Sequence, residues 1–300
     1  MKLILVYEEE NKNIADRLAA FIKRKKYNLT LSPVLIEADH PEFLADALSG
    51  ASHILSVLSK ASGGAPWFAF AAGFSLGSGC TLLYYPAVPD EAPQPPLSER
   101  FTLIGNEKAL GAYLAGETKE WAQRETVRRA RQTLLDRGVP VSRESLEHCI
   151  EERNYEAVSC FIEAGFAPDS RDKAGVPLLI LAARVGDRNI VRLLLQAGAS
   201  VNLQAEDRGS TALIDSAAGK NIDIMRLLLD AGADVNLKSK DGQSALILAV
   251  GLNDEVSVEM LLKAGANPDE SDSLGASARK YAQLFNKPAM LALFKTYAGP

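Results

Sequence analysis

Four glycines recur at an almost constant interval in the second half of the chain, and each follows an alanine. Neighbouring members of the series lie 33, 34 and 33 residues apart. A period of this length indicates a stack of supersecondary units, each of which can bury its apolar face only against the next one. Generic amphipathic helices would not keep this register over four units. The series consists of Gly165, Gly198, Gly232 and Gly265.

Each unit is expected to fold as two antiparallel helices followed by a turn that projects as a finger. In the second unit, small residues within 181–183 let neighbouring inner helices approach, and residues 190–195 form the apolar side of the outer helix. Gly198 then ends the outer helix in the left-handed conformation. A second glycine series marks the fingers at similar spacing: Gly175, Gly209, Gly242 and Gly275.

These units resemble ankyrin repeats. The resemblance rests on the segments FIEAGFAPD, LLLQAGASVN, LLLDAGADVN and LLKAGANPD, and on degenerate forms of the family's T-P-L-H tetrapeptide, namely PLLI, TALI, SALI and SARK. In that family the histidine helps tie adjacent turns by hydrogen bonds. Ile180, Ile214 and Ile247 replace it here, so we expect apolar contact between repeats instead. Residues 142–300 are therefore expected to form an ankyrin-repeat α-solenoid of about five repeats, with divergent first and last repeats as caps.

The resemblance implies that the stack binds a protein partner through its finger tips and the concave face of its inner helices. Finger charges of both signs suggest polar recognition, and charges that only solvate the turns are the alternative. Asp172, Asp207 and Asp241 stand where the family uses an aspartate to organise the finger, so we expect structural roles for them. Asp272 is expected to be exposed in the last finger. The candidates for partner contact are Arg171, Lys173, Glu206, Arg208, Lys238, Lys240 and Glu270.

Composition narrows the classes of partner and compartment. A formal net charge of -5 and a pI near 5.4 argue against general binding of nucleic acid, which needs a basic surplus on one face. Residues 61–89 are uncharged, but they contain five glycines and the helix-breaking Pro66 and Pro86, so a buried helix and strand explain them better than a membrane span. Three cysteines without paired spacing suggest neither a metal site nor disulfides, and they fit a reducing cytoplasm.

Strands and helices alternate along the first half of the chain. Apolar runs predict strands at 3–7, 32–37, 53–58, 81–85 and 101–104, and helices at 13–25, 41–48, near 67–76 and within 106–136. This alternation predicts a five-stranded parallel sheet covered by helices on both sides, a flavodoxin-like fold. We therefore expect an α/β domain at 1–116, a connecting helix at 117–141 and the repeats at 142–300. Ligands of such sheets bind at the carboxyl ends of the strands, where the proline-rich residues 86–98 form a lid or a simple connection.

Two segments of this half resemble a TIR (Toll/interleukin-1 receptor) domain: LILVYEEENKNIADRLAAFIKRKK and ASHILSVLSKASGGAPWFAFAAGFSLGSGCTLLYYP. In that family a strand ending in serine is followed by a loop, a tryptophan and, four residues later, a glutamate. In the catalytic branch this glutamate supports cleavage of the nicotinamide–ribose bond of NAD. Ser59 and Trp67 match the pattern, while Ala71 stands at the glutamate position. The resemblance implies that NAD or a related nucleotide, where one binds, contacts Tyr7, Glu8, Ser59 and Trp67.

The missing glutamate changes what this domain is expected to do. Cleavage develops oxocarbenium character at the ribose, which a carboxylate can stabilise or trap and a methyl group cannot. We therefore assign no catalytic residue and no required cofactor, and expect a silent signalling domain that self-associates or holds a nucleotide without hydrolysing it. A natural pseudoenzyme and a disabled variant both fit Ala71. The alternative is an NAD glycohydrolase or nucleoside-processing enzyme regulated by the repeats, using one of the acids at Glu8–Glu10 or Asp39, although a solvated charge run explains these acids more simply.

Overall fold

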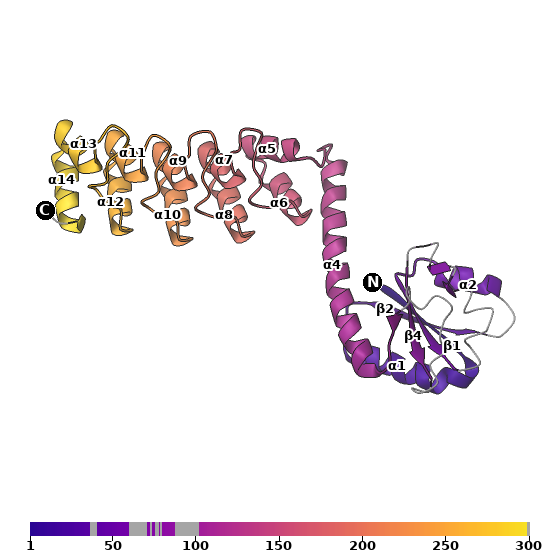
Figure 1. Cartoon of the computed structure of the whole chain (residues 1–300). Coiled ribbons are helices and arrows are strands. Elements are labelled where there is room, and N and C mark those ends of the chain that lie inside the picture. The colour runs from indigo at the N-terminus through magenta and orange to yellow at the C-terminus, as the bar shows by residue number, and fades with distance from the viewer. Residues whose placement is uncertain are drawn as a thin grey trace. The chain divides into compact units, whose positions relative to one another are not determined.

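The computed structural model describes residues 1–36, 41–59, 71, 72, 74, 75, 78, 80–87 and 102–298. The chain forms two compact units, Met1–Glu125 and Thr126–Pro300 (Figure 1). Helix α4 (Glu107–Asp136) belongs to both. It contributes Leu110 and Leu114 to an apolar cluster of the first unit and Leu134 to the core of the second.

The first unit is built on a parallel sheet of five strands, as the alternating pattern predicts. The order of the strands across the sheet is β2-β1-β3-β4-β5, and every pairing is parallel. The chain therefore winds outward in opposite directions from the neighbouring strands β1 and β3. The strands are β1 (Lys2–Glu8), β2 (Thr30–Ile36), β3 (His53–Leu58), β4 (Thr81–Pro86) and β5 (Thr102–Leu103).

Helices cover both faces of this sheet because alternate residues of β1 point to opposite sides. Ile4 and Val6 pack in one apolar cluster with α2 (Pro41–Leu48). Leu3 and Leu5 pack in another cluster with α1 (Lys12–Arg24) and the first part of α4. Between β1 and α1 the chain makes one 3-10 turn, η1 (Glu9–Asn11).

Two predicted features of this half fall partly or wholly outside the described residues. Of the helix predicted near 67–76, residues 71, 72, 74 and 75 are described and helical. Most of the proline-rich segment at 86–98 lies outside the described residues, so its predicted role as lid or connection stays a prediction.

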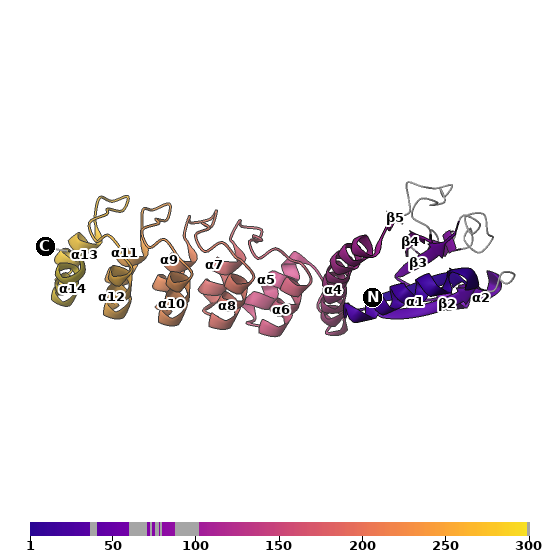
Figure 2. The same ribbon diagram turned by 90° about the horizontal axis from the view of Figure 1, so that it is seen from below.

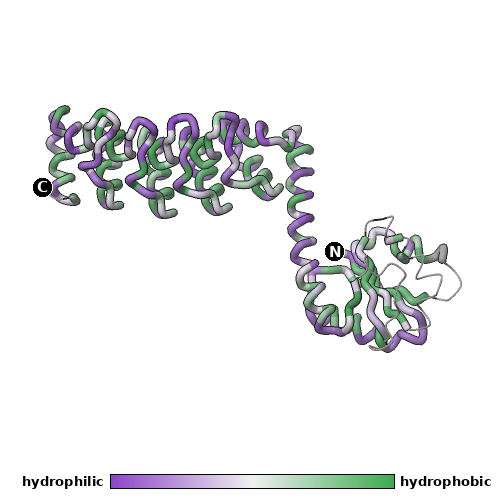
Figure 3. Tube along the Cα trace, viewed as in Figure 1, coloured by the Kyte–Doolittle hydropathy of each residue, from purple (hydrophilic) through white to green (hydrophobic). Residues whose placement is uncertain are grey.

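The second unit consists of five helix pairs stacked in sequence order, which confirms the predicted helical repeats (Figures 1 and 2). One continuous apolar core runs from α4 to α14, and hydrophobic stretches recur along these helices (Figure 3). The inner helices are α5 (Arg143–Glu151), α7 (Leu178–Val185), α9 (Ala212–Ala218), α11 (Ala245–Gly251) and α13 (Ala278–Leu284). The outer helices are α6 (Tyr155–Glu163), α8 (Arg188–Gln196), α10 (Ile222–Asp230), α12 (Glu255–Lys263) and α14 (Pro288–Ala298).

Three of the four degenerate tetrapeptides cap the inner helices that they begin, whereas Pro177 of the first makes no side-chain cap. The hydroxyls of Thr211, Ser244 and Ser277 each accept a hydrogen bond from the backbone N–H three residues later. A cap of this kind stabilises a helix by about 1 kcal/mol. The first letter of the tetrapeptide therefore keeps its structural role even where the histidine is lost.

Isoleucine takes the place of that histidine between neighbouring inner helices. Ile180, Ile214 and Ile247 are 1%, 3% and 4% exposed and belong to the continuous core. In the last repeat the same register position holds Lys280, which is exposed. The apolar column is thus interrupted by a charged, exposed residue in the last repeat.

The finger glycines offer a matched pair for measuring how closely the fingers pack. Gly242 and Gly275 both have φ +73°, so alanine at either position carries a left-handed strain of about 1 kcal/mol. A Cβ at Gly242 would also lie 2.6 Å from the Ser273 nitrogen, whereas a Cβ at Gly275 meets no described atom within 4 Å. In urea unfolding, Gly242→Ala should therefore lower the free energy of unfolding clearly more than Gly275→Ala. Equal losses would contradict close finger packing.

Candidate functional site

Backbone hydrogen bonds join each finger to the next. The Glu206 N–H donates to the Gly175 carbonyl at 3.1 Å, and the Lys240 N–H donates to the Arg208 carbonyl at 2.9 Å. The last finger is joined in the same way, from the Ser273 N–H to the Asp241 carbonyl at 3.1 Å. These links hold the finger backbones in fixed register along one edge of the stack.

Several side chains that were predicted to contact a partner instead form hydrogen bonds and ion pairs within and between the fingers. Arg171 donates from Nη1 to the carbonyls of Gly175 at 2.7 Å and Gln204 at 3.0 Å, and its Nη1 lies 3.7 Å from Glu206 Oε1. Lys240 Nζ donates to the Glu206 carbonyl. These interactions engage Arg171, Glu206 and Lys240 within the stack itself.

The last two fingers are joined by a further pair of predicted residues. Lys238 Nζ lies 2.9 Å from Glu270 Oε2 and donates to the Ser271 carbonyl at 3.1 Å. Lys173 and Arg208 are exposed, and their side chains take no part in these links between fingers. The Lys173 side chain is 75% exposed, with Nζ 3.8 Å from Glu144, and Arg208 is exposed. Partner contact by any of the seven stays a prediction.

The finger aspartates divide into different roles. Asp172 accepts hydrogen bonds from the N–H groups of Ala174 and Val176, both at 2.8 Å, and so organises its finger as the resemblance implies. Asp272 does the same in the last finger and accepts from Tyr281 Oη at 2.7 Å. It is 8% exposed, so the expectation of an exposed Asp272 is wrong. The backbone turn places its carboxylate inside the finger, where it satisfies two N–H groups.

A cluster of polar side chains around Arg184, here called the arginine cluster, was not predicted from the sequence. Arg184 donates from Nε to Asp215 Oδ2 at 2.6 Å, and from Nη1 and Nη2 to Asp207 at 3.0 and 3.2 Å. Nη2 also lies 3.2 Å from Ser210 Oγ. The hydrogen bonds from Arg184 lower the pKa of Asp207. The available signal was the repeat register, since Arg184 and Asp215 lie on adjacent inner helices.

The exposed surface of the inner helices, here called the inner-helix face, is acidic at its first repeat. Helix α5 carries three glutamates and its C-cap residue is a fourth; Glu147 is only 16% exposed, and the basic side chains of the helix are Arg143 and His148. Arg143 Nε lies 3.7 Å from Glu147, and His148 Nε2 lies 3.1 Å from Glu152. Burial raises the pKa of Glu147. The four acids are Glu144, Glu147, Glu151 and Glu152.

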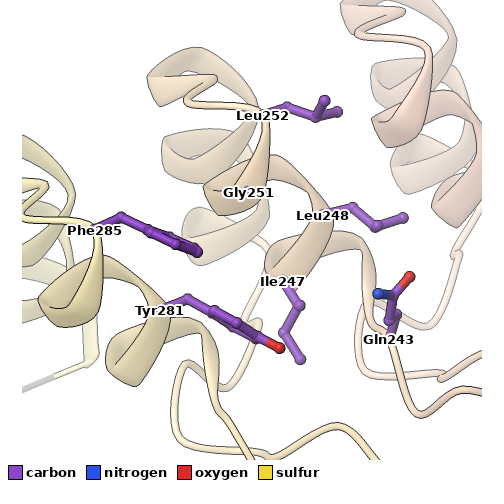
Figure 4. Close-up of a pocket in the computed structure, with 7 residues that line it drawn as sticks. All are labelled: Gln243, Ile247, Leu248, Gly251, Leu252, Tyr281 and Phe285. Atoms are coloured by element: carbon purple, nitrogen blue, oxygen red, sulfur yellow. The ribbon is translucent and has the colours of Figure 1, made fainter. Parts of the chain in front are cut away.

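The same face is apolar at its other end. A groove of about 260 Å³ lies between α11 and α13 (Figure 4). Leu252 and Phe285 on its walls are 39% and 51% exposed, and the rings of Tyr281 and Phe285 stack with centroids 5.8 Å apart. An apolar surface of this kind marks a site of interaction more often than a random feature of the surface. The lining residues are Gln243, Ile247, Leu248, Gly251, Leu252, Tyr281 and Phe285.

A second candidate site lies at the carboxyl ends of β1 and β3. Ligands of open parallel sheets bind where neighbouring strands lead to opposite sides, and β1 and β3 are such a pair. Ser59, which follows β3, donates from Oγ to Glu10 Oε1 at 2.6 Å. Asn11 is 4% exposed, and its Nδ2 has no hydrogen-bond partner among the described residues. The structure thus brings predicted Ser59 to the same edge as Glu8, the last residue of β1, with Glu10 between the two strands.

The other predicted residues of this site are placed differently. Tyr7 is 8% exposed and packs in the apolar cluster beneath α1. Ala71 is fully buried in the opposite apolar cluster, together with Ile4 and Leu44. Trp67 lies outside the described residues. Nucleotide contact by Tyr7, Glu8, Ser59 or Trp67 therefore stays a prediction.

Two other classes of site are absent from the described residues. Along the described parts of the chain, the structure contains no helix that is both long and apolar enough to cross a membrane. Over the same residues, His, Cys, Asp and Glu side chains form no group of three that could hold a metal ion.

Replacement of Arg184 by methionine tests the arginine cluster. We expect the free energy of unfolding at pH 7 to fall by about 2 kcal/mol, because two carboxylates lose hydrogen bonds from a charged donor. The folded-state pKa of Asp207 is lowered, so this contribution exists above the unfolded pKa of about 3.9 and disappears as the pH falls through the lower folded value.

Urea unfolding between pH 7 and pH 3 provides the measurement. The difference between the parent chain and Arg184→Met should shrink below about pH 4. Arg188→Met is the control, because its exposed guanidinium lies 4.0 Å from Asp223 and should contribute little. A difference that is constant over the whole pH range would contradict the assigned role of Asp207.

Comparison with known proteins agrees with the helix pairs and their register. The sequence profile described as "Ankyrin repeats (3 copies)" matches residues 146–239 and residues 179–272. A protein of Treponema pallidum (strain Nichols), named as ankyrin repeat-containing, is 34% identical over 228 residues, which is 76% of each chain. A match of 228 residues in a chain of 300 begins no later than residue 73, so the likeness extends beyond the repeats into the first unit. The chain belongs to the ankyrin-repeat protein family.

Proposed function

We propose that this chain is an interaction protein whose ankyrin stack holds a protein partner on its fingers and inner-helix face. The observation that carries the proposal is the apolar groove between α11 and α13, bordered by the exposed side chains of Leu252 and Phe285. Exposed apolar side chains on a rigid scaffold are typical of binding surfaces. The links between fingers add rigidity, so little conformational entropy is lost when a partner binds.

For the first unit we propose a flavodoxin-like, TIR-like signalling or assembly domain without catalytic activity. The strand order β2-β1-β3-β4-β5 supports a flavodoxin-like fold. The burial of Ala71 among apolar side chains supports silence, because a methyl group there offers no carboxylate to a ribose. In this proposal the domain self-associates or holds NAD or a related nucleotide intact.

One observation favours an enzyme as the second candidate. Glu10 carries a carboxylate at the junction of β1 and β3, where it accepts a hydrogen bond from Ser59. A carboxylate at this position could stabilise positive charge on a ribose. The second candidate is therefore an NAD glycohydrolase or nucleoside-processing enzyme that the repeats regulate.

A cytoplasmic location forms part of the proposal. Cys80, Cys149 and Cys160 are free thiols in the structure. Burial raises the pKa values of Cys149 and Cys160, which keeps both thiols protonated and unreactive at neutral pH. Free, protonated thiols suit a reducing compartment.

Capture of a partner from extract of the source cells tests the interaction function. The full chain serves as bait, and captured proteins are quantified by mass spectrometry. The double variant Lys173→Glu, Arg208→Glu should reduce capture, because it reverses two exposed finger charges that take no part in the links between fingers. Lys295→Glu, an exposed change on outer helix α14, should leave capture unchanged. Failure of the full chain to enrich any protein above a beads-only control would contradict the proposal.

Incubation with NAD tests the proposed silence of the first unit. We expect the full chain to release nicotinamide no faster than buffer alone, because position 71 carries no carboxylate. Release above the buffer rate that Glu10→Gln abolishes would establish the enzyme instead.

The variant Ala71→Glu asks whether the glutamate alone is missing. Ala71 is fully buried, so the new carboxyl group would enter an apolar cluster at a cost of several kcal/mol. Its circular dichroism must therefore match that of the parent before its activity is interpreted. Nicotinamide release by a folded Ala71→Glu chain would favour a disabled enzyme over a structural domain.

A further inference from the structure

The apolar groove is sized for one side chain. Its volume of about 260 Å³ lies below the roughly 300–1,000 Å³ of small-molecule pockets. Gly251 contributes to its lining, and a Cβ there would meet no described atom within 4 Å. Figure 4 shows Tyr281 and Phe285 of α13 on one side, and Leu248 of α11 and the following Leu252 on the other. A large aliphatic or aromatic side chain is the occupant that these walls fit.

The position through which the repeats contact one another is charged in the last repeat. The register position through which each repeat contacts the next is isoleucine in the second to fourth repeats and Lys280 in the last. Arg279 beside it is paired with Asp269, with Nε 2.7 Å from Oδ1. The contact position of the last repeat therefore carries charged residues. The exposed apolar side chains of the groove lie on the inner-helix face.

The acidic end of the inner-helix face lies in register with the groove. Arg153 and Asn253 both follow their inner helices with φ 57°, so the preceding residues correspond in the two repeats. Glu151 and Glu152 thus occupy the positions of Gly251 and Leu252, which line the groove. The side chains of the two acids are 60% and 58% exposed. Carboxylates and groove therefore lie along one line on the same face, three repeats apart.

The surface between these two ends is small or internally neutralised. Ala218 and Gly219 hold the corresponding positions on α9. The charge of Arg184 is compensated by Asp207 and Asp215. At these positions an occupant therefore meets small residues beside α9 and an arginine on α7 whose charge is compensated within the stack.

We propose that the inner-helix face binds an extended segment of a protein partner, with a large apolar side chain in the α11–α13 groove and basic residues against the α5 glutamates. This inference rests on the proposed interaction function and specifies the partner's chemistry. Neighbouring helices lie about 8–10 Å apart, so the two ends are separated by roughly 25–35 Å. An extended chain advances about 3.3 Å per residue, so the basic and apolar residues should be about eight to ten positions apart.

Electrostatic repulsion makes a second copy of this chain an unfavourable occupant of the inner-helix face. The chain carries a formal net charge of -5, so a second copy would bring mainly like charge to the α5 glutamates. A basic segment brings the opposite charge, and its attraction weakens with ionic strength because the carboxylates are exposed.

Selection from a random 16-residue peptide library displayed on phage tests the inference with the full chain as target. We expect the enriched peptides to carry lysine or arginine at one end and a large apolar residue about eight to ten positions away. Synthetic peptides from the enriched set are then measured by fluorescence anisotropy. Enrichment of acidic peptides, or of peptides without the apolar residue, would overturn the inference.

Two groove and charge variants make the binding measurement specific. Gly251→Leu fills the groove and should weaken the selected peptides at least tenfold, while Gly116→Leu is the control at another helical glycine with open space. Glu151→Lys with Glu152→Lys should weaken binding and reduce its salt dependence, whereas Glu163→Lys on α6 should not. Circular dichroism establishes that each variant is folded.

Binding of the variants to a partner captured from extract tests this inference separately from the proposed interaction function. A partner that still binds Gly251→Leu and the double lysine variant with full affinity would overturn the inference and leave the interaction function standing. Loss of that partner with both variants, but not with their controls, would support the inference and the function together.

Discussion

The column of buried isoleucines between inner helices is the contact on which the repeat unit depends. A single helix pair cannot bury its apolar face, so each pair needs the next. Ile180, Ile214 and Ile247 supply this contact where ankyrin repeats use a hydrogen-bonding histidine. The same position is Glu147 in the first repeat and Lys280 in the last. One register position thus carries the apolar contact between the central repeats and a charged residue in the first and last of the five.

Most of the residues that follow the inner helices have a strained backbone, and two of them form hydrogen bonds to the next inner helix. Four of the five inner helices are followed by a non-glycine residue with positive φ, which costs about 1 kcal/mol at each position. Two of these residues offset the cost with a charged donor. Arg153 donates to the Val185 carbonyl and Lys220 to the Leu252 carbonyl, each at the end of the next inner helix. A cation is also favoured there by the helix dipole.

The sequence predicts what depends on local pattern and misses what depends on spacing between repeats. Buried parallel strands are continuous apolar runs, and the strand predicted at 53–58 is observed at His53–Leu58. The glycine register likewise predicts the helix pairs. In the sequence, Arg171 and Lys238 look like exposed charges, because the carbonyls to which they donate lie about one repeat away along the chain. At the sheet edge, Ser59 is a predicted candidate, but its hydrogen bond to Glu10 depends on how closely η1 approaches the residue that follows β3.

The charges on the first repeat destabilise its inner helix, which a cap that only kept the stack soluble would not require. Glu147 and Glu151 lie four residues apart on α5, and like charges at this spacing destabilise a helix. A solvated cap could alternate its charges at no such cost. At the other end of the same face, Phe285 is half exposed although burial would stabilise the stack. Departures from the stability optimum at both ends of one face are expected where the surface is shaped by a ligand, because functional sites are where proteins tolerate such costs.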